Sequence, residues 1–133
     1  MKGGAFLDTN VLLYALAEED RRTPLADALL EAGGTISVQV LNEFVAVARR
    51  KLKLDWRQIA SLIAVARRIC GPAVPLTQET HDHARQIAER YRLSFYDALI
   101  VATALSAGCT TLWSEDMQDG LAIEGLTIRN PFS

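Results

Sequence analysis

AFLDTN, residues 5–10, contains the clearest structural signal in this chain. It closes an apolar run that begins at Lys2, and it stops at Asp8-Thr9-Asn10. These three residue types favour helix N-termini, because their side chains accept hydrogen bonds from free backbone N–H groups. We therefore predict a buried strand over residues 2–7 that leads directly into a helix over residues 11–17.

Short strands and amphipathic helices alternate along the rest of the chain. The predicted helices cover residues 24–32, 39–52, 55–69, 77–91 and 94–107, and the predicted short strands cover residues 35–38, 73–76, 110–113 and 126–129. Thr23, Asp55 and Thr77 are the predicted N-caps of three of these helices. The alternation predicts an α/β fold in one domain over residues 1–133, a three-layer α/β/α sandwich around a central parallel sheet of about four to five short strands.

The composition indicates a soluble globular protein. Half of the 133 residues are apolar and 23% are charged, and no apolar run approaches the roughly 20 residues that span a membrane. The first acid comes at Asp8, too early for the apolar core of a signal peptide, so we expect a cytoplasmic protein without a membrane partner. The net charge of −2 argues against a protein that coats nucleic acid, but it does not exclude a nuclease. Cys70 and Cys109 make no disulfide framework.

Four acidic residues stand at the edges of apolar stretches: Asp8, Glu43, Asp97 and Asp116. Asp8 and Asp116 follow predicted strands, and ligands of parallel sheets bind at the carboxyl ends of the strands. Glu43 borders the apolar stripe of its helix, and Asp97 lies at the end of the core-facing stripe of the helix over residues 94–107. These contexts make the four acids candidates for one site.

Each of these acids also has a purely structural explanation. Asp8 can cap a helix, Glu43 can lie at the edge of the core, and Asp116 can cap a short turn. Ser94 and Asp97 match a capping box in which Asp replaces the usual Glu or Gln. Taken one at a time, the acids leave both explanations open.

Taken together, the four acids predict a metal site. If the fold brings them within about 5 Å of one another, each ionised pair repels by roughly 3 kcal/mol, and all the pairs add up to on the order of 20 kcal/mol. That sum exceeds the stability of a typical domain. Either the carboxylates bind protons or a divalent cation neutralises them, and all-oxygen ligands select Mg²⁺ or Mn²⁺.

The same residues resemble the motifs of a known family. The resemblance rests on four short segments: Phe6 to Asn10, Asn42-Glu43-Phe44, Ser94 to Ala98, and Trp113 to Met117. In this order, over essentially the whole chain, they resemble PIN-domain ribonucleases, and specifically the VapC toxins of bacterial and archaeal toxin–antitoxin pairs. The resemblance implies a central parallel sheet flanked by helices, and a metal-dependent endoribonuclease that is the toxin of such a pair.

The resemblance also implies a catalytic role for the four acids. Asp8, Glu43, Asp97 and Asp116 match the positions that bind one or two Mg²⁺ or Mn²⁺ ions per site. Hydrolysis by water should leave a 5′-phosphate and a 3′-hydroxyl, as in similar enzymes.

Neighbouring residues match supporting positions of the family. Thr9, Asn10 and Ser114 match positions that support the acids through hydrogen bonds. Asp119 matches a position that sometimes supplies a further acid. Glu115 stands next to Asp116, so the sequence leaves open which of the two faces the metal.

The partners implied by the resemblance are an RNA substrate, a cognate antitoxin and a second copy of the chain in a homodimer. The basic residues at the far end of the Glu43 helix are candidates to bind the RNA backbone: Arg49, Arg50 and Lys51. Four apolar residues either form an exposed face that carries the antitoxin or dimer contact, or belong to the core: Leu54, Trp56, Ile59 and Ile63.

Other classes of protein fit less well. A histidine ribonuclease needs two imidazoles that act together, but His81 and His83 point in different directions on a helix. A phosphatase of the haloacid dehalogenase type needs Asp-x-Asp after its first strand, and here Asn10 replaces the second acid. A phospho-receiver domain needs a late lysine, and none follows Lys53. The remaining alternative is a non-catalytic PIN-like scaffold that binds RNA or protein, which the intact set of acids disfavours.

Overall fold

The computed structural model describes residues 4–133, and this range contains six helices and four strands. The strands are β1 (Ala5–Leu7), β2 (Thr111–Trp113), β3 (Ala122–Ile123) and β4 (Leu126–Arg129). The helices are α1 (Thr9–Leu16), α2 (Thr23–Glu31), α3 (Val38–Arg50), α4 (Trp56–Cys70), α5 (Gln78–Tyr91) and α6 (Phe95–Ser106). Lys2 and Gly3, which belong to the predicted first strand, lie outside the described residues.

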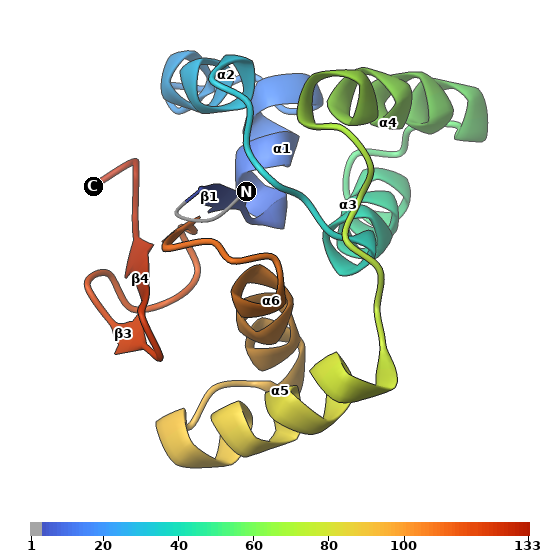
Figure 1. Cartoon of the computed structure of the whole chain (residues 1–133). Helices are drawn as coiled ribbons and strands as arrows, with labels where there is room; N and C mark the ends of the chain where they lie inside the picture. Colours follow the sequence, from blue (N-terminus) through green and yellow to red (C-terminus); the bar gives the residue numbers. More distant parts are fainter. Residues whose placement is uncertain (1–3) are drawn as a thin grey trace.

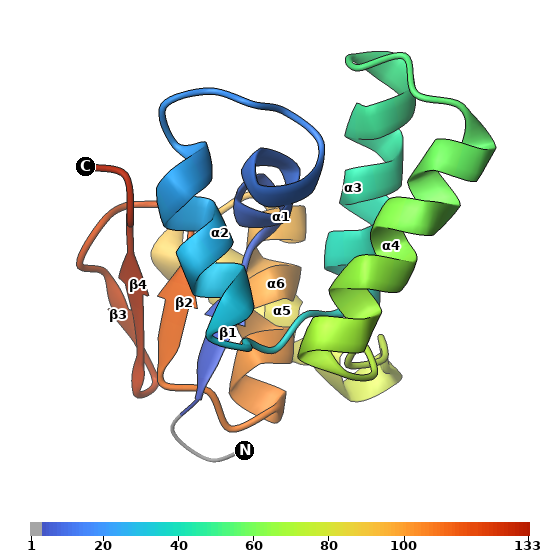
Figure 2. The same cartoon turned by 90° about the horizontal axis from the view of Figure 1, so that it is seen from above.

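The strands form one mixed sheet in the order β1-β2-β4-β3. β1, β2 and β4 are parallel, with Phe6 beside Leu112 and Leu112 beside Ile128, whereas β3 pairs antiparallel with β4. Helices α1 and α2 lie on one side of this sheet, α5 and α6 lie on the other, and α3 and α4 lie beyond the β1 edge (Figure 1, Figure 2). The predicted α/β sandwich is confirmed, and the short antiparallel edge strand β3 is an addition that the sequence pattern does not predict.

The strands predicted over residues 35–38 and 73–76 are wrong. Thr35 makes a single parallel bridge to Phe6, and Ser37 makes a single one to Val74. Ser37 is the N-cap of α3, where its hydroxyl accepts a hydrogen bond from the N–H of Val40 (3.1 Å). Because the helix begins immediately after Ser37, no strand can extend there, and these segments only continue the edge of the sheet beyond β1.

Side-chain caps fix where several helices begin. Asp55 and Thr77 are the N-caps of α4 and α5, and each forms a capping box, so these two predictions are confirmed. The prediction for Thr23 is wrong, because Thr23 is the first residue of α2 and Arg22 occupies the cap position without a side-chain hydrogen bond. The Thr23 hydroxyl instead accepts a hydrogen bond from the N–H of Asp20 (3.0 Å) in the loop before the helix.

The core packs between the sheet and the helices. The strand centres Phe6, Leu112 and Ile128 are each fully buried, and every residue of α6 from Ala98 to Ala104 is buried as well. This packing holds the end of β1 and the start of α6 in fixed relative positions. Within residues 4–133, no helix combines the length and the apolar character needed to cross a membrane.

Candidate functional site

Asp8 follows β1 directly and bonds to two parts of the chain at once. It is the N-cap of α1, where its Oδ1 accepts a hydrogen bond from the N–H of Thr9 (2.7 Å). Its Oδ2 accepts a second one from the hydroxyl of Ser114 (2.7 Å), and the residue is only 2% exposed. The capping explanation for Asp8 is therefore correct, and the other oxygen still joins Asp8 to the segment after β2.

The segment after β2 brings Asp116 to the same end of the sheet. The hydroxyl of Ser114, which donates to Asp8, accepts a hydrogen bond from the N–H of Asp116 (3.2 Å). Asn10, in the first turn of α1, donates from Nδ2 to Oδ2 of Asp116 (3.1 Å). Because β1 and β2 are parallel neighbours, Asp8 and Ser114 leave the sheet side by side.

Glu43 reaches the cluster from α3. Its Oε1 accepts a hydrogen bond from the hydroxyl of Thr9 (3.0 Å), and its Oε2 accepts one from Nε2 of Gln39 (3.0 Å). Gln39 lies one turn before Glu43 on the same helix face and is itself buried. Both oxygens of Glu43 are thus oriented by side chains that border the cluster.

Asp97 completes the set from the first turn of α6. The hydroxyl of Ser94 accepts a hydrogen bond from the N–H of Asp97 (3.2 Å), and this is the one half of the predicted capping box that forms. Burial raises the pKa of the Asp97 carboxyl above its ordinary value, the Ser94 hydrogen bond lowers it, and the charge of Asp116 raises it. Asp97 is therefore coupled to the other acids through Asp116.

The cluster carries negative charge that forms no ion pair with a basic side chain of residues 4–133. Burial raises the pKa of Asp8 to about 7, even though the hydrogen bonds from Ser114 and Thr9 lower it, and the charges of Glu43 and Asp116 raise it further. Within residues 4–133, none of the four acids makes an ion pair with lysine, arginine or histidine. A buried carboxylate in this position needs either a proton or a cation from solution.

The donor set fits a hard divalent cation. Asp8 and Asp116 offer carboxylate oxygens, which the hydroxyl of Ser114 and the amide of Asn10 orient. Oxygen ligands suit Mg²⁺ or Mn²⁺. No three Asp, Glu, His or Cys side chains in the range 4–133 lie close enough to form a complete metal site. Mg²⁺ usually keeps several of its waters and takes only one or two carboxylates directly, so its binding does not require three protein ligands.

The structure separates Glu115 from its neighbour Asp116. Oε1 of Glu115 accepts a hydrogen bond from the hydroxyl of Tyr14 (2.8 Å), and Oε2 lies 2.6 Å from Nε of Arg22. The carboxylate therefore contacts α1 and the loop before α2, while Asp116 bonds to Asn10. Of the two acids, Asp116 is the one that lies with Asp8 in the cluster.

Asp119 is not brought to the cluster. Its Oδ1 accepts a hydrogen bond from the N–H of Asn130 (2.9 Å), beyond the end of β4, and the side chain is exposed. In this structure Asp119 fastens the C-terminal segment to the loop after β2.

The three basic residues at the end of α3 have different surroundings. Arg49 donates to the carbonyl of Leu54 (3.0 Å) and lies over the ring of Trp56, and Nζ of Lys51 lies 3.5 Å from Oε1 of Glu18. Arg50 alone among the three lines a groove that also contains Glu43 and Asp97.

The apolar face expected on α3 and α4 is only partly present. Trp56 is 63% exposed, but Ile59 is buried, so of the two alternatives the core position is the correct one for Ile59. Leu54 and Ile63 are half-buried and pack against the core. Since Ile59 belongs to the apolar stripe of α4, its burial follows from the helical period that positions that stripe inward.

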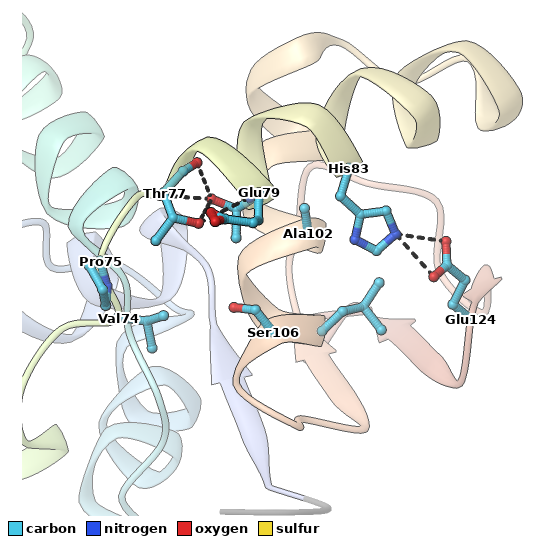
Figure 3. A pocket seen from close by; sticks show the side chains of 10 residues that line it. Val74, Pro75, Thr77, Glu79, His83, Ala102, Ser106 and Glu124 are labelled. Carbon is cyan, nitrogen blue, oxygen red and sulfur yellow. Dashed lines mark hydrogen bonds and ion pairs between the residues drawn. The ribbon is translucent and has the colours of Figure 1, made fainter.

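A second groove, of about 680 Å³, lies away from the acids. Figure 3 shows Val74 and Pro75 on one side of it, Thr77 and Glu79 at the start of α5, and the pair His83 and Glu124 at its far end. Nε2 of His83 lies 3.0 Å from both carboxylate oxygens of Glu124. The groove reaches α6 at Ala102 and Ser106. Ser106 lies about 13 Å along the helix axis from Asp97, so this groove is separate from the acid cluster.

Three residues that the structure places around the acids are not predicted from the sequence. Gln39 has a local signal, because it precedes Glu43 by four residues on a helix. Tyr14 and Arg22 have no local signal, because they contact Glu115, which lies 101 residues after Tyr14 in the sequence. These contacts become visible only in the folded chain.

Comparison with known proteins finds one family model that fits this architecture. The model of the PIN domain matches residues 5–121, which include the four acids. No curated protein sequence matches the chain.

Several solved structures share the fold. A toxin–antitoxin complex from Klebsiella pneumoniae is 21% identical, covers 96% of this chain and 98% of its own, and superposes with a TM-score of 0.72. DNA-bound VapBC from Salmonella typhimurium is 22% identical, covers 98% of this chain and 99% of its own, and has a TM-score of 0.70. VapC20 of Mycobacterium tuberculosis, a toxin that cleaves the sarcin-ricin loop, is 20% identical, covers 84% of this chain and 91% of its own, and has a TM-score of 0.67.

Proposed function

Because the chain belongs to the PIN domain family, we propose that it is a Mg²⁺- or Mn²⁺-dependent endoribonuclease and the toxin of a toxin–antitoxin pair. The observation that carries the proposal is the cluster of Asp8, Glu43, Asp97 and Asp116. It joins the ends of β1 and β2 to α3 and α6, and no cation of the described residues 4–133 pairs with it.

The acids of the cluster would hold one or two divalent ions. When bound, such an ion would polarise the phosphodiester and make water a competent nucleophile near neutral pH. The chain's own residues orient the ligands: Ser114 and Thr9 hold Asp8, Asn10 holds Asp116, and Thr9 with Gln39 holds Glu43. This second layer of hydrogen bonds sets which oxygens remain available to the ion.

The proposed partners are an RNA substrate, an antitoxin and a second copy of the chain. The solved structures that share the fold include complexes of toxin with antitoxin, which supports an antitoxin partner. The proposed place of action is the cytoplasm.

The proposal is tested by a cleavage assay on structured and unstructured RNAs. Wild type and Asp8→Asn are compared in Mg²⁺, in Mn²⁺ and in EDTA, and the ends of the products are mapped. We expect cleavage by wild type in either metal with 5′-phosphate ends, none in EDTA, and a loss of at least about a hundredfold in Asp8→Asn.

A matched control is Asp119→Asn, which removes an acid that the structure keeps out of the cluster and should retain activity. If wild type cleaves no RNA and binds no Mg²⁺ in a calorimetric titration, the nuclease proposal is wrong. The chain would then be a PIN-like scaffold, and its protein or RNA partner would become the question.

A further inference from the structure

The groove that contains Arg50 opens directly from the acid cluster. It has a volume of about 510 Å³ and is lined by residues of α3 and of the first turn of α6: Gln39, Asn42, Glu43, Ala46, Arg50, Tyr96 and Asp97. Two of these residues, Glu43 and Asp97, belong to the cluster itself. A ligand in the groove therefore lies next to Glu43 and Asp97 of the acid cluster.

One face of α3 forms the floor of this groove. Asn42, Ala46 and Arg50 follow one another at four-residue spacing, so they lie in a row along the helix. Arg50 lies about 10 Å along the axis from Glu43. The small side chain of Ala46 leaves room in the middle of the row, between Asn42 and Arg50.

Arg50 is a cation without a partner in the described chain. Within residues 4–133 it makes no ion pair, whereas its neighbours Arg49 and Lys51 are engaged with Leu54 and Glu18. A phosphodiester chain with one phosphate at the acids and metal would carry its next phosphates toward this arginine. Arginine binds phosphate oxygens through two N–H groups at once.

Tyr96 lines the same groove from the first turn of α6. It is 62% exposed, although it immediately precedes a site acid. Its ring meets that of Phe95 edge-on at 5.7 Å, and Phe95 packs in turn against His81. The exposed ring is therefore braced from one side, and exposed aromatic rings of this kind are stacking surfaces for unpaired nucleic-acid bases.

We propose that this groove is the seat of the nucleotide next to the scissile phosphate, with its base stacked on Tyr96 and its phosphate bound by Arg50. The proposal rests on the proposed ribonuclease function, and it adds the requirement that this nucleotide be unpaired. The bases of an RNA duplex are stacked inside the helix and cannot reach the ring.

Binding is measured first, with a reading that does not depend on cleavage. The probe is an unstructured 12-nucleotide RNA that carries 2-aminopurine, titrated in EDTA against wild type, Tyr96→Ala and Tyr96→Phe, with a 12-base-pair RNA duplex as the comparison. We expect Tyr96→Ala to weaken binding of the single strand about tenfold and to abolish quenching of the 2-aminopurine, while Tyr96→Phe keeps both. Binding of the duplex should change less than about twofold.

Arg50→Ala tests the phosphate contact separately. It should weaken binding of both RNAs and reduce the dependence of log K on log salt by about one. Arg68→Ala, which removes an exposed arginine of α4, and Leu25→Ala, which removes a 52% exposed side chain of α2, are the matched controls and should bind like wild type.

Kinetics in Mg²⁺ separate this proposal from the proposed function. If wild type cleaves, Tyr96→Ala should raise KM about tenfold with kcat changed less than about twofold. Cleavage by wild type with an unchanged KM and unchanged single-strand affinity in Tyr96→Ala would overturn the groove assignment, leave the nuclease intact and leave the groove to a protein partner. Tyr96-dependent quenching without cleavage of any RNA and without Mg²⁺ binding would reject the nuclease and, with it, a place next to a scissile phosphate, and would leave a groove that only binds single-stranded RNA.

Discussion

Asp8 is the residue on which the cluster depends most. It ends β1, caps α1 and accepts a hydrogen bond from Ser114, so its position is fixed from three directions. Burial is the largest of the effects that raise its pKa to about 7. The folded chain thus holds Asp8 in a place where its charged form is unfavourable unless a cation is present.

Without metal, Asp8 should make the stability of the protein depend on pH. Its pKa is about 7 in the folded state, against an ordinary value of 3.8, so the fold binds a proton more tightly than the unfolded chain does. The resulting stabilisation is complete below about pH 4 and is lost as the pH rises through 7. In EDTA we expect the free energy of unfolding from urea titrations to fall on the order of 4 kcal/mol between pH 4 and pH 8 from this residue.

Asp8→Asn should remove that dependence, because the amide keeps the size of the side chain and does not titrate. The variant should be more stable than wild type at pH 8 in EDTA and similar to it at pH 4. Asp119→Asn, which changes an exposed acid, should follow wild type at every pH. Equal slopes for Asp8→Asn and wild type would contradict the pKa of Asp8.

The hydroxyl of Thr9 should matter for metal affinity. It donates to Oε1 of Glu43, and side chains that orient metal ligands typically change affinity by a factor of about 10 to 100. We expect Thr9→Ala to weaken Mn²⁺ binding about tenfold in a calorimetric titration. Thr9→Ser keeps the hydroxyl and should bind like wild type, so equal losses in the two variants would show that the methyl group, and not the hydrogen bond, is responsible.

A set of side-chain contacts, here called the clamp, holds the segment after β2 against α1 and the loop before α2. Glu115 accepts a hydrogen bond from the hydroxyl of Tyr14, and Arg22 forms ion pairs with both Glu115 and Asp20. Arg22 also lies 4.8 Å above the ring of Tyr14, which packs edge-on against Phe132. The clamp holds the Glu115 carboxylate against α1 and the loop before α2, away from Asp116, which bonds to Asn10.

Tyr14→Phe should loosen this clamp without changing its packing. A hydrogen bond to a carboxylate at a partly exposed site contributes about 1 kcal/mol, so the free energy of unfolding should fall by about that amount. Tyr96→Phe, which removes a hydroxyl from an exposed side chain, is the control and should leave stability unchanged. A Tyr14→Phe variant as stable as wild type in urea titrations would mean that Glu115 is held by Arg22 alone.

Elements that depend on local contacts are predictable from the sequence, and those that depend on distant ones are less so. Asp55 and Thr77 cap helices through backbone groups three residues away, and both predictions are confirmed. Residues 35–38 have the composition of a strand, yet Ser37 caps α3, so the helix begins where the strand would continue. β3 has only two residues and exists because the turn at Glu124-Gly125 folds it back onto β4, which no periodicity can indicate.

The candidate site also combines features that the sequence predicts with contacts that only the fold creates. The acids are recognisable because each stands where an apolar pattern ends, and the structure brings the ends of β1 and β2 together through parallel pairing. Which oxygens are oriented by which donors is decided by contacts such as Asn10 with Asp116, across 106 residues. The sequence alone therefore leaves Glu115 and Asp116 undecided, and the fold separates them.

Mg²⁺ should stabilise the whole folded molecule. An ion that binds only the folded state adds about 2.7 kcal/mol at a concentration about one hundred times Kd. The gain should increase as the pH rises through 7, because Asp8 must lose its proton to bind the ion. Thermal unfolding with and without Mg²⁺ at pH 6 and pH 8 measures this, and an equally large gain in Asp8→Asn would show that the ion binds elsewhere.

The order of the four acids along the chain has a consequence for how the protein is made. Asp8 leaves the ribosome first and Asp116 last, with about a hundred residues between them, which take about 5 to 20 s to synthesise. The hydrogen bonds from Ser114 to Asp8 and from Asn10 to Asp116 cannot form until β2 has emerged and paired with β1. A nascent chain that has not yet paired β2 with β1 therefore lacks the assembled cluster, even when its first helices have already formed.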